Sequence, residues 1–174
     1  DKLGVPVQWK TPIASAWLTA RVFMFLLFER WHGWHGRWST AWAGLSLMLV
    51  GFALCMGSPM FAGMGFGTGV GVLITGLSIT GCGIAITYYG ALYYAMAVGN
   101  AQVDAGGKHE AMIGVGYTLG PLCAIAGLGL SSAGSETGVP SDDAFRVWVI
   151  VLISAAVLLT TCMSWALLAK QRRK

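Results

Sequence analysis

The sequence predicts an all-α polytopic membrane protein with five transmembrane helices. Of its 174 residues, 56% are hydrophobic and only 10% are charged, and the mean hydropathy is +0.67. A soluble domain carries roughly 25% charged residues, so this chain lacks the polar side chains to cover itself in water. These values exclude a soluble enzyme, a disordered segment and a coiled coil.

Five stretches are apolar and long enough to cross a bilayer, which takes roughly 20 residues. They cover residues 11–31, 40–57, 69–98, 110–130 and 146–169 of one transmembrane domain, 1–174. We expect Thr11 to cap the first helix with Pro12 at its first helical position. The second stretch stops at Ser58-Pro59, and the third is long and rich in glycine, so it should tilt, bend or protrude.

Basic residues are distributed unequally between the two predicted sides. The first and third connectors and the C-terminus hold seven: Arg30, Arg37, Lys108, Lys170, Arg172, Arg173 and Lys174. The N-terminus and the other two connectors hold three: Lys2, Lys10 and Arg146. The positive-inside rule therefore places the N-terminus outside and the C-terminus in the cytoplasm.

The sequence shows no pattern typical of an enzyme or a nucleic-acid binder. Its four cysteines fall in four different apolar stretches without a CxxC pair, and His32 and His35 have no third ligand nearby. The net charge is +4, but the basic residues lie in loops and ends rather than in one patch. We expect no catalytic group, metal, cofactor or nucleic-acid partner, and the start lacks the features of a signal peptide.

Arg21 is the most informative single residue because it falls near the middle of the first predicted span. A central arginine costs about 2.5–3.5 kcal/mol on insertion scales, so another group must satisfy it. It lines a polar path for a substrate, pairs with a neighbouring helix, or snorkels to the membrane surface because the span is shifted.

Four tyrosines gather toward the end of the third span in the string YYGALYY. Tyr89 and Tyr93 are four residues apart and share one helix face. A tyrosine ring with a polar tip suits a substrate path, and it suits equally the aromatic belt at a membrane interface.

Glycine spacing predicts close helix packing at two places. Gly67 and Gly71 form one GxxxG, and Gly116 and Gly120 form another, followed by Pro121. Small residues four apart allow helix backbones to approach each other, while the Gly-Pro step could alternatively act as a hinge. Glu110 opens the fourth span, where a carboxylate favours the positive end of the helix, so we expect it to be a helix cap.

The order of these features resembles the C-terminal end of a major facilitator superfamily (MFS) transporter. The resemblance rests on FLLFERWHGWHGRW, on YYGALYYAM, on HEAMIGVGYTLGP and on the basic tail KQRRK. It covers nearly the whole chain and implies that the five spans correspond to helices eight to twelve of that fold. It also implies a cytoplasmic C-terminus and, from the similarity to one bacterial branch, a bacterial inner membrane.

Two functions follow from this resemblance. MFS transport needs two six-helix halves around a central site, so five helices would form the C-terminal segment of a transporter of a small solute, not competent for transport alone. Alternatively, the chain is an MFS-derived accessory subunit of a larger membrane complex, for example photosynthetic or respiratory. In both cases its partners are the lipid bilayer and other membrane helices.

Overall fold

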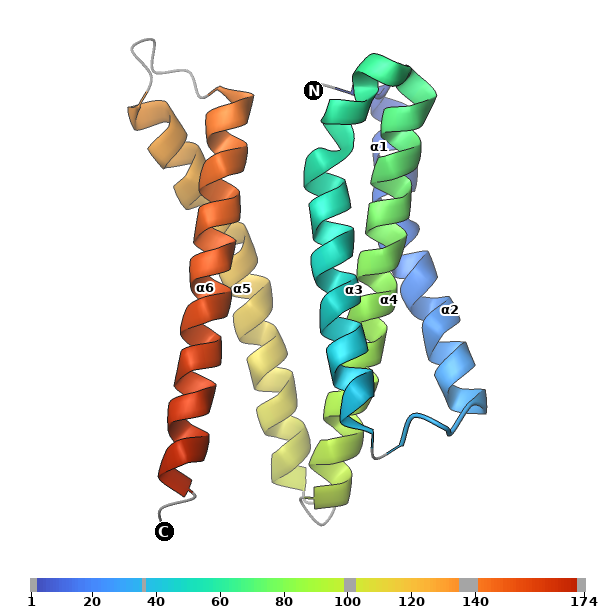
Figure 1. The fold of residues 1–174 in the computed structure, drawn as a ribbon, viewed down its shortest axis with the longest axis vertical. Coiled ribbons are helices and arrows are strands. Elements are labelled where there is room, and N and C mark those ends of the chain that lie inside the picture. Colours follow the sequence, from blue (N-terminus) through green and yellow to red (C-terminus); the bar gives the residue numbers. More distant parts are fainter. Residues whose placement is uncertain (1–2, 36, 99–102, 135–140, 172–174) are drawn as a thin grey trace. The chain divides into compact units, whose positions relative to one another are not determined.

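The computed structural model describes residues 3–35, 37–98, 103–134 and 141–171, and these residues form helices and connectors without any strand. The elements follow one another along the chain (Figure 1) as α1 (Val7–Ala14), α2 (Ala16–Arg30), α3 (Trp38–Gly57), the 3₁₀ helix η1 (Ser58–Met64), α4 (Phe66–Val98), α5 (Val103–Ala133) and α6 (Asp142–Gln171).

Four helical stretches in the described residues are long and apolar enough to cross a membrane. They are Val7–Arg30, Ser39–Met64, Phe66–Tyr94 and Ile113–Ala133. The chain is therefore an α-helical integral membrane protein by length and composition. The fifth predicted span, 146–169, falls within α6 and stays a prediction.

The chain divides into two compact units, residues 1–109 and 110–174. In the first, α4 packs against α3 and also against α2, and Figure 1 shows α3 running alongside it. In the second, α5 meets α6 at Gly127, where an added Cβ would lie 3.1 Å from a methyl group of Val149. The prediction of a single domain stays a prediction.

The first helix begins earlier than the sequence predicts. It starts at Val7 behind Pro6, and Pro12 lies inside α1 rather than at its start. Thr11 is not a cap, because it lies inside α1, which begins four residues earlier. Proline removes one backbone donor and kinks a helix, and the helix is interrupted at Ser15, whose hydroxyl donates to the Pro12 carbonyl at 2.7 Å.

The predicted capping role of Glu110 is also wrong. α5 begins at Val103, so Glu110 lies two turns inside the helix, beyond the first turn in which a carboxylate can cap it. The sequence pattern places the polar residues before Glu110 in a connector, whereas the chain from Val103 onward is already helical.

A tight turn joins α3 to α4 through η1. Gly65 ends η1 with φ of 124°, a conformation that side chains other than glycine rarely adopt. Its N–H donates to the Ala62 carbonyl at 3.1 Å, and its own carbonyl accepts the N–H of Thr68 at 3.1 Å. The chain thus reverses direction, and α4 runs back along α3.

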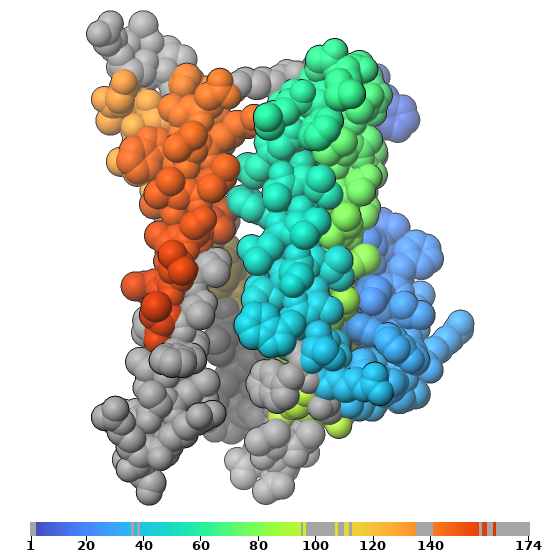
Figure 2. Space-filling view, in the orientation of Figure 1, coloured from blue at the N-terminus to red at the C-terminus, as the bar shows by residue number. Residues whose placement is uncertain are grey.

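The α3–α4 contact depends on two pairs of facing glycines. A Cβ on Gly51 would lie 2.7 Å from the Gly76 carbonyl oxygen, and one on Gly76 would lie 2.9 Å from the Gly51 oxygen. In the same way, a Cβ on Gly83 would lie 2.7 Å from the Gly44 carbonyl oxygen. The helix backbones therefore touch at two points, and Figure 2 shows the side chains of α3 and α4 side by side.

Threonines beside these glycines keep their own polar groups satisfied. The hydroxyls of Thr80 and Thr87 each donate to the carbonyl four residues earlier, on Gly76 and Gly83, at 2.9 Å. The Thr87 hydroxyl also contacts the Met48 sulfur at 3.8 Å. Because the threonine hydroxyls bond within α4, the glycine contact has no unpaired hydroxyl to desolvate.

The four glycines predicted to pack from their GxxxG spacing do not make this contact. An added Cβ at Gly67, Gly71, Gly116 or Gly120 would meet no atom within 4 Å in the described part of the chain. Close packing occurs instead at Gly44, Gly51, Gly76 and Gly83, and at Gly81, whose Cβ would meet the Trp17 carbonyl of α2. Packing of the GxxxG pairs against other chains stays a prediction.

Replacing Gly76 with alanine should destabilise the protein by about 1–3 kcal/mol, because the methyl group would overlap backbone atoms of α3. The free energy of unfolding in detergent micelles, from titration with sodium dodecyl sulfate, measures this loss. Gly71→Ala is the matched control, five residues away on α4 in open space, and it should be neutral or stabilising by up to about 1 kcal/mol. Equal effects of the two substitutions would contradict the glycine contact.

Candidate functional site

Arg21 lies on α2 inside the candidate span Val7–Arg30. Its guanidinium carbon is 5.2 Å from the centre of the Phe25 ring and 5.4 Å from that of Tyr88 on α4. Such cation–π contacts are worth about 0.5–2 kcal/mol, more when water is excluded. The rings therefore offset part of the cost of a charge at this depth.

One nitrogen of Arg21 has no partner among the described residues. Its Nε is buried and makes no hydrogen bond. A buried donor without an acceptor costs about 1–3 kcal/mol, and more when the group is charged. The described residues therefore leave part of the hydrogen-bonding capacity of the guanidinium unused.

Tyr89 and Tyr93 belong to an aromatic cluster that reaches this arginine through Phe25. We use that name for Phe25, Phe28, Trp34, His35, Tyr88, Tyr89 and Tyr93. Phe25 links the two parts, because its ring contacts the Arg21 guanidinium and lies 5.0 Å from the Tyr89 ring in an edge-on arrangement. Arg21 and Tyr89 are therefore linked through Phe25, whereas Tyr93 joins the cluster further along, through Trp34.

The connector between α2 and α3 completes the cluster. Trp34 lies 6.0 Å from Tyr89 and 5.4 Å from Tyr93, both edge-on. His35 stacks on Tyr93 at 4.6 Å with an interplanar angle of 5°. Offset and edge-on ring pairs each add about 0.5–1.5 kcal/mol beyond burial, so the connector is held against α4.

Local geometry explains why Trp34 points inward. Its indole Nε1 donates to the Phe28 carbonyl at 3.5 Å, and its own carbonyl accepts the Thr40 hydroxyl at 3.3 Å. Phe28 and Trp34 are only 3% and 5% exposed, and together with Ile86 they form the buried core of this end. Both ends of the short connector are thus tied to this tryptophan.

The sequence alone does not indicate that Phe25, Phe28, Trp34 and His35 belong to this cluster. Phe25 follows Arg21 by four residues, and a helix brings residues at that spacing together. That spacing could have identified the Phe25 contact. Trp34 and His35 lie outside any helix, so no periodicity indicates where they point.

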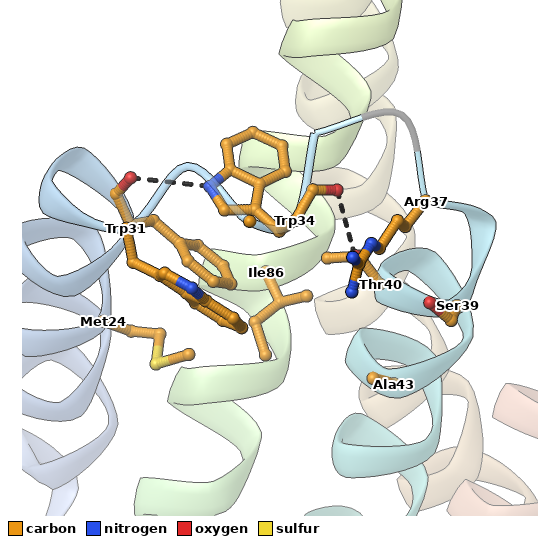
Figure 3. Close-up of a pocket in the computed structure, with 10 residues that line it drawn as sticks. Met24, Trp31, Trp34, Arg37, Ser39, Thr40, Ala43 and Ile86 are labelled. Atoms are coloured by element: carbon orange, nitrogen blue, oxygen red, sulfur yellow. Dashed lines mark hydrogen bonds between the residues drawn. The ribbon is translucent and has the colours of Figure 1, made fainter.

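A cavity of about 300 Å³ opens beside the cluster, where α2 ends and α3 begins. Figure 3 shows Met24 and Trp31 of the α2 side facing Arg37, Ser39 and Thr40 of the α3 side across Ile86 of α4. The remaining lining residues are Phe28, Gly33, Trp34 and Ala43. Its inner part is apolar, and its polar groups come from the first turn of α3 and the residue before it.

Metal ligands do not gather at this site. His32 and His35 lie with ring centres 5.4 Å apart, and the described residues contain no group of three metal-binding side chains.

The helical fold and its apolar spans define an integral membrane protein. Comparison with known protein families, curated proteins and solved structures found no match.

Trp34→Ala should destabilise the protein by about 3–5 kcal/mol, the range for removing a large buried aromatic side chain. Trp42→Ala is the control, because Trp42 is 67% exposed on α3 and should change stability by less than about 1 kcal/mol. Unfolding in micelles, followed by circular dichroism, compares the two variants. Similar losses for both tryptophans would show that the aromatic cluster does not hold the connector.

Proposed function

We propose that the chain is the C-terminal segment of an MFS-like secondary transporter of a small solute. The observation that carries this proposal is Arg21, a charged residue inside a candidate span with a buried nitrogen that has no acceptor in the described chain. An ionisable residue at membrane depth costs free energy and is by default the mark of a functional site.

The geometry around Arg21 favours an anionic solute. A guanidinium binds a carboxylate or phosphate through two parallel hydrogen bonds, and the rings of Phe25 and Tyr88 fix its position from one side. Tyr89 lies beside Phe25, so the tyrosines would form the aromatic wall of the solute path. In this proposal, helices outside the chain supply the other wall, because alternating access needs two halves.

A second candidate is an MFS-derived accessory subunit of a larger membrane complex. The specific observation in its favour is that Gly67, Gly71, Gly116 and Gly120 all face open space in the described chain. Glycine is poor at filling a lipid-facing surface but lets another helix approach closely. In this candidate function those faces contact partner subunits, and Arg21 binds an acceptor of a partner.

We place the protein in a bacterial inner membrane with its N-terminus outside and its C-terminus in the cytoplasm. The seven-to-three distribution of basic residues supports this orientation. In a background without native cysteines, Ser135→Cys should react with an impermeant maleimide added outside intact cells, and His32→Cys should react only after lysis. Labelling of Ser135→Cys only from the cytoplasmic side would show that the chain has the opposite orientation.

Arg21→Lys should lower solute uptake by about tenfold or more, because lysine keeps the charge but loses the planar pair of donors. Cells that express the whole gene are tested for uptake of radiolabelled monocarboxylates, dicarboxylates and sugar phosphates. Arg30→Lys is the matched control at the exposed end of the same helix, and its rate should stay within about twofold of wild type.

The same cells distinguish the two candidate functions. Uptake that depends on the gene, and that Arg21→Lys impairs at an unchanged protein level, supports the transporter. If no solute in the panel accumulates and Gly120→Leu reduces the size of the complex on a native gel, the result supports the accessory subunit and contradicts the transporter. Full uptake by the Arg21→Lys variant would contradict the role of Arg21 in the solute path.

A further inference from the structure

The cavity at the α2–α3 connector lies at a membrane boundary. One candidate span ends at Arg30 and the next begins at Ser39, and the cavity is lined by residues from both sides of that break. Its depth along the bilayer is therefore that of the interface between headgroups and acyl chains, where tryptophan side chains gather.

The lining is divided into an apolar part and a polar rim. Met24 and Phe28 of α2 and Ile86 of α4 provide the apolar part. Arg37 and the hydroxyl-bearing Ser39 lie on the opposite side (Figure 3). Both of these residues are exposed, so an anion at the membrane surface can reach the Arg37 guanidinium. The cavity thus pairs an apolar interior with a cationic rim at the depth of the lipid headgroups.

We propose that this cavity binds an anionic glycerophospholipid of the surrounding bilayer, with the lipid phosphate on Arg37 and the start of an acyl chain against Met24, Phe28 and Ile86. Basic pockets between membrane helices bind anionic headgroups in this way. A volume of about 300 Å³ is at the lower end of ligand pockets and takes part of a lipid, with the remainder of its chains in the bilayer.

The apolar part of the lining favours a lipid over a free phosphate ion. A small anion would use only Arg37 and the hydroxyl groups, and would leave uncovered the apolar wall, in which Met24 is half-buried and Trp31 is exposed. An acyl chain covers that wall and gains from its burial. This binding site goes beyond the proposed function, because it does not involve Arg21 and would exist in a transporter and in an accessory subunit alike.

Native mass spectrometry of the purified protein in detergent tests the proposal by counting bound lipids. Dioleoyl phosphatidylglycerol should be retained in preference to dioleoyl phosphatidylcholine. Arg37→Gln should reduce the retained phosphatidylglycerol by about fivefold, the effect of one basic residue on an anionic lipid. Arg30→Gln removes the same charge outside the cavity and should leave the lipid count nearly unchanged.

A second pair of variants tests the apolar part without changing charge. Ala43→Leu places a larger side chain in the cavity and should displace the lipid, whereas Ala53→Leu, at an exposed position on the same helix, should not. The Ala43→Leu result decides the proposal even if Arg37→Gln fails to fold. Equal retention of both lipids, an unchanged lipid count in Ala43→Leu, or displacement of phosphatidylglycerol by inorganic phosphate alone would each overturn it.

Discussion

Contact between the backbones of α3 and α4 is the constraint on which the rest of the first unit depends. Helices gain no hydrophobic energy by leaving lipid for one another, so their association relies on close van der Waals packing. Gly44 meets Gly83, and Gly51 meets Gly76. Glycine is required at these points because the backbone of the other helix occupies the space of any side chain. α4, held in this way against α3, presents a different face to α2.

The face of α4 that meets α2 carries the tyrosines near Arg21. Gly81 lets α2 approach at Trp17, and Tyr88 and Tyr89 follow about two turns further along α4. The approach brings Phe25 against both tyrosines and places the Arg21 guanidinium over aromatic rings instead of lipid. The position of the arginine is therefore a consequence of where small residues permit the helices to cross.

The helices could be predicted from the sequence because apolar length alone indicates a span. That Tyr89 and Tyr93 share one helix face could also be predicted, since four residues make about one helical turn. The contact between the glycine pairs could not be predicted, because Gly44 and Gly51 become recognisable only when the antiparallel register of α3 and α4 is known. The local GxxxG pattern pointed to Gly67 and Gly71, which face open space. The predicted helix starts at Pro12 and Glu110 were wrong for a related reason. Both residue types are typical of helix starts, but the residues before them are also helical.

The separation of the two glycine pairs has a mechanical consequence. Both pairs are seven residues apart on their helices, a distance of about 10.5 Å at 1.5 Å per residue. A slide of α3 along α4 by a single turn would push side chains into the glycine contacts, and only a shift of the whole ~10.5 Å spacing would bring one glycine opposite another again. The two glycine pairs therefore resist gradual sliding of α3 along α4. α2 is held differently: among the described residues it meets α4 through aromatic rings and through the close approach of Trp17 to Gly81, without a facing glycine pair.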